Sequence, residues 1–580
     1  MMIRYRGRSA LLLAALAILL GAWSIVIPIF EQPDEPSHWQ YARHLHDHWR
    51  LPLYERGFAE GNSPPLYYAL AAPLATASPV PPSAMVPTEG GGDASVAPPR
   101  RFLNSDKDFS RFSPIWRVRA LSIVMSMATV WLTFRIGSTL SSRRDAALLG
   151  ALMVALLPQF TFRGTGISND ALVTTLSAAA TLAVTALLRR GFTWPRGVWA
   201  GVALAGAYLI KISAIALVVP VAWALVVADA PGDPPERRTW IARLLRWGAL
   251  LPGALIVLPW TLYNIDRYGD PFASDAMRRV VPHLVNERSL FSDYFLWQFP
   301  LSLGKSFVGN FGWMNVGLPG WMYALYVALW LVAAFGLVWE WRRGLLDIRA
   351  VVTLALTFVS MYAVVVYMNL TFRQPQGRYL FPALPAVAGL ARLGLASLPG
   401  FMAWLRRPAV LGVVLGILNL HALAIAGSAY YPAPVRDVAP GVRNLQPAAI
   451  SGLVYAPQAN DFVLTRGDPW WILEADVDAR EFGSIRLALR ASLEPRAHQG
   501  CIRFATATRP LDANAPSCFT WIADGSTQEI AVPLSAHADW RGRVTHLRVD
   551  PSMPGKSARA SHSSVLSCAD EGRRRKTSSA

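Results

Sequence analysis

Two adjacent carboxylates are the residues of this sequence best suited to chemistry. Asp34 and Glu35 stand in the stretch QPDEPSH, directly after a long apolar run at the N-terminus. Charged side chains are costly at membrane depth, so an acidic pair at the exit of a first span indicates a functional site. The alternative is that both residues cap a helix beginning near Pro36 and interact with its dipole.

Further polar motifs follow, and three cations among them could hold a phosphate. The motifs are NSPPLYY, ISND at 167–170, YLIKIS at 208–213, GNFGW at 309–313 and QGRYLFP at 376–382. Arg378 is the first choice because it lies beside Tyr379 at the start of a span, where a guanidinium can grip phosphate oxygens with two parallel hydrogen bonds. Lys211 and Arg163 are the other two candidates. Lys211 and Arg378 could instead be ordinary anchors that snorkel to the interface.

The remaining candidates concern a sugar, an acceptor or a metal. Asn169 and Asp170 could bind a sugar or cap the following helix. His38 could contact the same ligand, or could complete a divalent metal site with Asp34 and Glu35, although other histidines follow nearby. We assign Trp313 and Gln376 to sugar or acceptor binding, while the glycines around Trp313 could mark only a tight turn. A divalent metal is the one cofactor left open.

The elements that must position these residues are membrane spans. Apolar residues make up 53% of the chain and the net charge is +18, which in a multispanning protein reflects arginine between spans rather than nucleic-acid binding. Windows of about 20 apolar residues predict about eleven transmembrane helices. They lie near 9–30, 115–139, 145–162, 170–188, 198–210, 212–229, 247–265, 321–340, 350–369, 379–395 and 409–428.

Arginine clusters fall on alternate sides of these spans, as the positive-inside rule requires. The clusters are Arg4 to Arg8, 143–144, 189–190, 237–238, 342–343 and 406–407. Their side is the cytoplasm, so the N-terminus is cytoplasmic and the first run is an uncleaved anchor in the plasma (inner) membrane. The exported side receives the loop 31–114, which carries the acidic motif, and everything after residue 430.

The chain divides into three predicted parts. Residues 1–430 form the transmembrane domain, with short interfacial helices flanking a Pro- and Gly-rich loop at about 76–100. Alternating segments such as WILEADVD and CIRFATA predict an exported β-sandwich domain over 431–551. Residues 552–580 are predicted to be a disordered basic tail. Cys501 and Cys518 could form a disulfide, because both lie in the exported part.

The motifs DEPSH, SND, FGW and QGRY, in this order over residues 1 to about 400, resemble the C-type glycosyltransferase superfamily. The resemblance is to the protein mannosyltransferase and aminoarabinose transferase branch, and above all to a bacterial membrane family of unknown function, number 2142. It implies an inverting hexosyltransferase that moves a sugar from a polyprenyl-phosphate donor to an envelope glycan or lipid acceptor on the exported face.

In such a family, the aspartate of the first exported loop, here Asp34, acts as the base. A hydroxyl acceptor needs a base, whereas a phosphate leaving group needs little protonation, so one carboxylate suffices. Glu35 would then orient Asp34, bind sugar hydroxyls or join a metal site. Two rival functions remain at this stage. One is a transporter or flippase of lipid-linked glycans, and the other is a glycan-binding assembly protein whose β-domain uses Trp470, Trp471 and Trp540.

Overall fold

Long apolar helices dominate the first 430 residues. The computed structural model describes residues 2–78 and 109–430 apart from gaps at 56–57, 59, 141–143, 231–238, 281–283 and 286–288, and the strand-forming parts of 449–567. It has two units, Met1–Pro79 with Lys107–Gly427, and Val80–Asp106 with Ser428–Ala580. We call them the helical unit and the strand unit.

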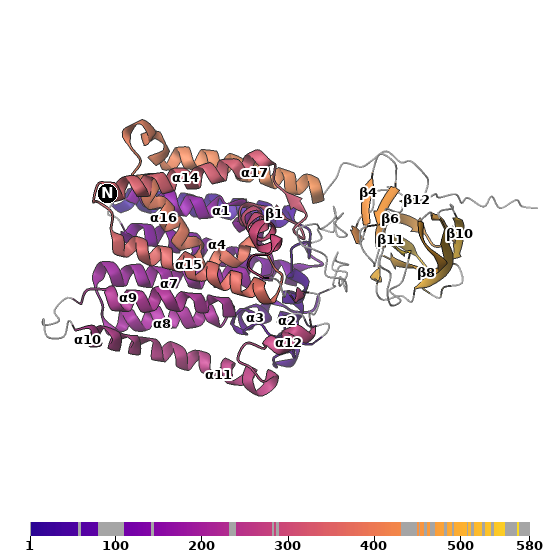
Figure 1. Cartoon of the computed structure of the whole chain (residues 1–580), viewed down its shortest axis with the longest axis horizontal. Coiled ribbons are helices and arrows are strands. Elements are labelled where there is room, and N and C mark those ends of the chain that lie inside the picture. The colour runs from indigo at the N-terminus through magenta and orange to yellow at the C-terminus, as the bar shows by residue number, and fades with distance from the viewer. Residues whose placement is uncertain are drawn as a thin grey trace, which may run out of the picture. The chain divides into compact units, whose positions relative to one another are not determined.

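Seven helices in the described part of the helical unit are long and apolar enough to cross a membrane. They are α4 (Ser113–Leu140), α7 (Asn169–Arg190), α10 through α11 (Trp240–Tyr268), α14 (Gly320–Arg342), α15 (Ile348–Thr371), η7 with α16 (Gly377–Ala396) and α17 (Pro408–Tyr430). Figure 1 shows α4, α7, α14, α15 and α17 running in roughly the same direction along the bundle. The helical membrane fold is therefore as expected.

The other four predicted spans are also helical but shorter. They correspond to α1 (Met2–Val26), whose described apolar part is Ala10–Val26, to α5 (Arg144–Ala155), to α8 (Trp194–Tyr208) and to η2 (Ile212–Leu217) with α9 (Val218–Val227). Lys211 is extended and separates α8 from η2. A charged residue between two short apolar helices thus marks a chain reversal at one end of the bundle.

Short helices of the first loop gather at the end of the bundle away from the N-terminus (Figure 1). They are α2 (Glu35–His48), α3 (Leu66–Ala71) and η1 (Ala72–Leu74). Aromatic side chains join them, and the rings of Tyr41 and Tyr68 stack with centroids 3.6 Å apart. Most of the Pro- and Gly-rich stretch predicted to be a loop lies outside the described residues.

Three further segments complete this end of the bundle. α6 (Pro158–Arg163) precedes α7, and α13 (Phe299–Val308) packs against η7 (Gly377–Ala383). The pair β1 (Asn310–Phe311) and β2 (Val316–Gly317) forms an antiparallel hairpin. Gly312, with φ of 60°, and Met314 lie in its turn, so the GNFGW motif forms the tight turn considered above. Ala276 of α12 (Ser274–Val280) shares a small apolar cluster with Tyr54 of the first loop.

The strand unit contains a five-stranded antiparallel sheet in the order β3-β6-β11-β8-β9. Its strands are β3 (Ala449–Ser451), β6 (Trp470–Asp478), β11 (Arg543–Asp550), β8 (Ser492–Thr506) and β9 (Ser517–Asp524). Side chains of this sheet share one core with the ribbon of β7 (Ser484–Leu489) and β10 (Gln528–Pro533). A disulfide joins Cys501 on β8 to Cys518 on β9.

The three tryptophans and the last strand of the strand unit differ from what the sequence suggested. Trp470, Trp471 and Trp540 are buried at 5%, 0% and 7% exposure, so they pack in the core and form no glycan-binding surface. A third sheet pairs β4 (Leu453–Ala456), β5 (Asp461–Leu464) and β12 (Val565–Ser567). Since β12 belongs to the predicted disordered tail, that prediction is wrong for these three residues. The rest of the tail from 552 on lies outside the described residues.

Candidate active site

The chain turns sharply between α1 and α2, and this turn presents Asp34. Phe30 and Asp34 both have left-handed backbone angles, with φ of 64° and 65°. Such angles are strained for most residues, and aspartate is one of the few that tolerate them. Asp34 occupies the N-cap position of α2, yet its side chain makes no capping hydrogen bond. Its carboxylate is therefore directed elsewhere, against the capping alternative.

The Asp34 carboxylate forms an ion pair with the Arg378 guanidinium, from residues 344 apart in the sequence. Its side chain is 37% exposed, whereas that of Arg378 is 4% exposed. Partial burial raises the pKa of the Asp34 carboxyl, but Arg378, with help from His38 and Arg163, outweighs this and holds the pKa below its usual value. Asp34 is therefore ionised at neutral pH.

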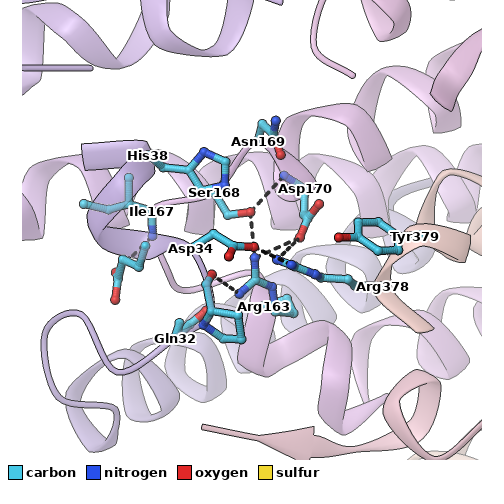
Figure 2. A network of polar contacts seen from close by, with 12 residues as sticks. Gln32, Asp34, His38, Arg163, Ile167, Ser168, Asn169, Asp170, Arg378 and Tyr379 are labelled. Atoms are coloured by element: carbon cyan, nitrogen blue, oxygen red, sulfur yellow. Dashed lines mark hydrogen bonds and ion pairs between the residues drawn. The ribbon is translucent and has the colours of Figure 1, made fainter. Parts of the chain in front are cut away.

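Three cations surround the buried carboxylate of Asp170, which lies beside Asp34. Figure 2 shows two of them, Arg163 and Arg378. Asp170 Oδ2 accepts hydrogen bonds from Arg163 at 2.8 Å and Arg378 at 3.3 Å, and Asp170 Oδ1 accepts one from Lys211 Nζ at 2.7 Å. The three cations and the two carboxylates, Asp34 and Asp170, leave a surplus of one positive charge. The sequence-predicted Arg163, Lys211 and Arg378 thus converge from three separate segments. We call this set the cation cluster.

Neighbouring groups fix the cation cluster in place. Arg163, which ends α6, also donates to the carbonyl of Pro33 and to Ser168 Oγ, both at 2.9 Å. Lys211 Nζ lies 4.6 Å from the centre of the Tyr379 ring, and the Arg378 guanidinium lies 5.2 Å from it. Cation–π contacts of this kind favour positive charge over an aromatic face. Arg163 ties the cation cluster directly to the turn that presents Asp34.

The cap of α7 is Ser168, whose hydroxyl accepts from the Asp170 backbone N–H at 3.1 Å. The carboxylate of Asp170 is thereby left for the three cations, so the predicted capping role of Asn169 and Asp170 belongs to Ser168. Within the described residues, the Asn169 side-chain amide donates to the Ile210 carbonyl at 3.5 Å. Its amide lies near the cation cluster but is not part of it (Figure 2).

Glu35 has a structural environment that differs from that of its neighbour. Its carboxylate is fully buried and pairs with Arg119 through Nε at 2.7 Å and Nη2 at 2.8 Å. It also accepts the backbone N–H groups of Phe30 and Ile167. With four donors on two oxygens, Glu35 has no capacity left for a metal or a sugar. The expected participation of Glu35 in the chemistry is not supported by these contacts.

Sequence reasoning missed Arg119, which also donates to the carbonyls of Ser24, Ile27 and Pro28 at the end of α1. It lies on α4, and an arginine inside an apolar span was the signal that could have revealed it. Arg119 therefore satisfies the last carbonyls of α1 and fixes the start of the Asp34 turn.

A second polar group adjoins Asp34 and contains Glu60, which sequence reasoning also missed. Single ligand atoms of Asp34, His38 and Glu60 all lie within 4.8 Å of one another, a spacing that could hold a cation. However, His38 Nδ1 is already 2.8 Å from the Tyr68 hydroxyl, and Asp34 is paired with Arg378. Burial lowers the pKa of the His38 imidazole despite the nearby Glu60 and Asp34 carboxylates, so the ring is neutral at pH 7.

Trp313 and Gln376 lie outside this network. The indole N–H of Trp313 donates to Glu31 at 3.3 Å from the hairpin of β1 and β2. Gln376 immediately precedes η7, and its side-chain oxygen has no hydrogen-bond partner among the described residues. Their assignment to sugar or acceptor binding stays a prediction.

Comparison with known families gives one match. Residues 113–387 match a family described as Predicted membrane protein (DUF2142), which confirms the resemblance inferred from the motifs. The match includes the cation cluster and Arg119 but not Asp34. No curated protein sequence matches the chain.

Several solved structures have a distantly similar arrangement. They include ArnT from Cupriavidus metallidurans bound to undecaprenyl phosphate, with 12% identity over 73% of this chain and 75% of that chain and a TM-score of 0.42. Archaeal oligosaccharyltransferase AglB from Archaeoglobus fulgidus, in complex with an inhibitory peptide and a dolichol-phosphate, has 12% identity over 74% and 56%, with a TM-score of 0.37. Arabinosyltransferase EmbB from Mycobacterium smegmatis has 11% identity over 96% and 64%, with a TM-score of 0.39.

Proposed function

We propose that this membrane protein is a glycosyltransferase that passes a sugar from a polyprenyl-phosphate donor to a cell-envelope acceptor on the exported face, with Asp34 as general base. The observation that carries the proposal is the cation cluster beside an ionised and partly exposed carboxylate. A surplus of positive charge suits the phosphate of a lipid-linked donor, and the carboxylate suits an acceptor hydroxyl.

The cation cluster retains hydrogen-bond donors that a phosphate could use. The Nε atoms of Arg163 and Arg378 are buried without a hydrogen-bond partner among the described residues. Buried donors of this kind cost free energy unless a ligand satisfies them. A phosphate could bind these guanidinium groups and Lys211, with its polyprenyl chain lying along the neighbouring apolar helices.

Sugar transfer would follow from the adjacency of Asp34 and the cation cluster. Asp34 would take the proton from an acceptor hydroxyl as its oxygen attacks the anomeric carbon, and the sugar–phosphate bond would break with its electrons going to the phosphate. The cation cluster would stabilise the charge that develops on that phosphate. A single displacement of this kind inverts the anomeric centre. It needs only one carboxylate, which agrees with the saturation of Glu35 by Arg119 and backbone N–H groups.

The test is carrier-dependent transfer by the purified protein, supplied with a panel of radiolabelled polyprenyl-phosphate sugars and an envelope fraction. Asp34→Asn should lower transfer by about 10²- to 10⁴-fold while donor binding is kept, because loss of a general base has that magnitude. Asp47→Asn is the matched control, since Asp47 is a carboxylate on α2 that forms an ion pair with Arg43. Full transfer by Asp34→Asn would refute the proposed mechanism.

A further inference from the structure

A row of polar side chains leads from Asp34 through the first-loop helices. A ring nitrogen of His38 lies within 4.8 Å of an Asp34 carboxylate oxygen, a separation that one bridging water or a small rotation closes. His38 Nδ1 lies 2.8 Å from the Tyr68 hydroxyl, and this hydroxyl donates to Glu60 Oε2 at 3.4 Å. The rings of His38 and Tyr68 stack with centroids 5.8 Å apart.

The hydrogen-bond pattern gives this row a direction. Tyr68 uses its single proton toward the Glu60 carboxylate, so its oxygen is left to accept from His38. That assigns the proton of the neutral imidazole to Nδ1 and leaves Nε2 as an acceptor. Each group along the row can therefore take a proton from one side and give one up on the other.

The row joins two partly exposed carboxylates through two buried side chains, since the Asp34 side chain is 37% exposed and Tyr68 is fully buried. The side chain of His38 is 3% exposed and that of Glu60 is 19% exposed. Glu60 is held in place by Ser63, whose hydroxyl donates to Glu60 Oε2 at 2.6 Å. The row therefore begins at the proposed base and ends at a carboxylate in contact with solvent.

We propose that His38, Tyr68 and Glu60 form a relay that removes the proton taken up by Asp34 in each transfer. The proton passes from the Asp34 carboxyl to His38 Nε2, the Nδ1 proton passes to the Tyr68 oxygen, and the Tyr68 proton passes to Glu60 and then to water. No bond other than O–H and N–H bonds changes, and Asp34 is returned to its ionised form. His38 is left with its proton on Nε2, and between transfers it gives this proton to water at the exposed Asp34 side while Nδ1 regains one through Tyr68 and Glu60. This inference rests on the proposed function of Asp34.

The same three ligand atoms could hold a divalent cation, but their contacts favour the relay. His38 Nδ1 is engaged by Tyr68, and Asp34 is engaged by Arg378, so a cation would have to displace both contacts. The three positive charges of the cation cluster would also repel it. We therefore treat cation binding as an outcome that the test must be able to reveal.

The test compares transfer by the full-length wild type with His38→Gln and Tyr68→Phe at saturating donor, in weak buffer and with added imidazole. Both variants should lower kcat about tenfold or more with the KM for donor unchanged within about twofold, as expected for loss of a proton-transfer group. Small imidazole molecules should restore kcat of His38→Gln, which a purely structural role would not allow. Tyr68→Phe keeps the ring stack, so it tests the hydroxyl alone.

His46→Gln is the matched control, since His46 lies on the same helix and contacts the Ala72 carbonyl instead. Unchanged kcat in both His38→Gln and Tyr68→Phe, or a loss that imidazole does not restore, would overturn the relay. Loss of wild-type transfer on chelation, restored by a divalent metal, would overturn it in favour of a cation site. Absence of transfer by the wild type would refute the proposed function and the relay together, whereas the other outcomes refute the relay alone.

Discussion

Two neighbouring carboxylates, Asp34 and Glu35, have opposite environments in this protein. Asp34 is partly exposed and faces the cation cluster, whereas Glu35 is fully buried and saturated by Arg119 and two backbone N–H groups. The left-handed angle at Asp34 separates the directions of the two side chains. One residue can therefore serve chemistry while the next anchors the turn that presents it.

Removing one member of the buried pair should be costly. Glu35→Gln leaves the Arg119 guanidinium without its countercharge in a site of 0% exposure, so unfolding free energy should fall by about 3–5 kcal/mol. Thermal unfolding in detergent measures this. Asp47→Asn, which removes an i,i+4 pair with Arg43, should change stability by only about 0.5 kcal/mol. Equal effects of the two substitutions would contradict the anchoring role of Glu35.

The ionisation of Asp34 should depend on Arg378. Because Arg378 lowers the pKa of Asp34 against the effect of burial, the wild-type carboxyl should titrate at a lower pH than an ordinary aspartate, and Arg378→Gln should raise its pKa above that of the wild type. Infrared difference spectra against Asp34→Asn identify the carboxylate band. An identical titration in the wild type and in Arg378→Gln would show that this ion pair does not form.

At the residue scale, the sequence predicted which side chains belong to the site better than it predicted which residues they contact. Asp34, Arg163, Lys211 and Arg378 were identified because charges at span ends are few, and the fold brings them together. The role of Glu35 could not be predicted, since its partner Arg119 lies 84 residues away on another helix. Glu60 gave no signal in a loop where exposed acidic residues are ordinary.

At the scale of elements, a close approach of two backbones sets the position of Arg378. Gly377 begins η7, its N–H donates to Ser306 Oγ at 2.8 Å, and a Cβ built on it would lie 2.2 Å from the backbone nitrogen of Phe307. Only glycine lets η7 lie this close to α13. The sequence motif QGRY is therefore explained partly by packing and partly by the charge of Arg378.

Gly377→Ala should displace η7 and weaken carrier binding along with stability. The clash is with backbone rather than with a flexible side chain, so neither element can yield without moving Arg378. Polyprenyl-phosphate affinity and thermal unfolding together measure the effect. Gly304→Ala on α13 is the control, because a Cβ there meets nothing within 4 Å. Normal carrier affinity in Gly377→Ala would show that this contact does not position Arg378.

Helix positions were predictable from apolar length, and each of the eleven predicted spans contains helix. The breaks within them were not, because η2 and η7 depend on local contacts that no hydropathy window records. Lys211 was visible as an interruption between two short apolar runs, but its pairing with Asp170 on another helix was not.

At the scale of the whole molecule, the chain consists of a helical unit and a strand unit. The change from a helical to an alternating pattern predicted both kinds of structure, and the family match falls entirely within the helical unit. The order of the five-stranded sheet could not be predicted, since its central strand β11 follows the other four strands of that sheet in the sequence. All residues of the proposed chemistry lie in the helical unit.

In the proposed mechanism, the carrier phosphate and Asp34 meet at Arg378. The most direct measurement is polyprenyl-phosphate affinity in the wild type, Arg378→Gln and Asp34→Asn, alongside sugar transfer. Arg378→Gln should lose about tenfold or more in affinity, since a charge-assisted bidentate contact has that magnitude. Asp34→Asn should bind as well as the wild type or better, because Arg378 is freed from its carboxylate, while transfer is lost. Equal affinity in all three proteins, or binding lost equally in both variants, would contradict the account.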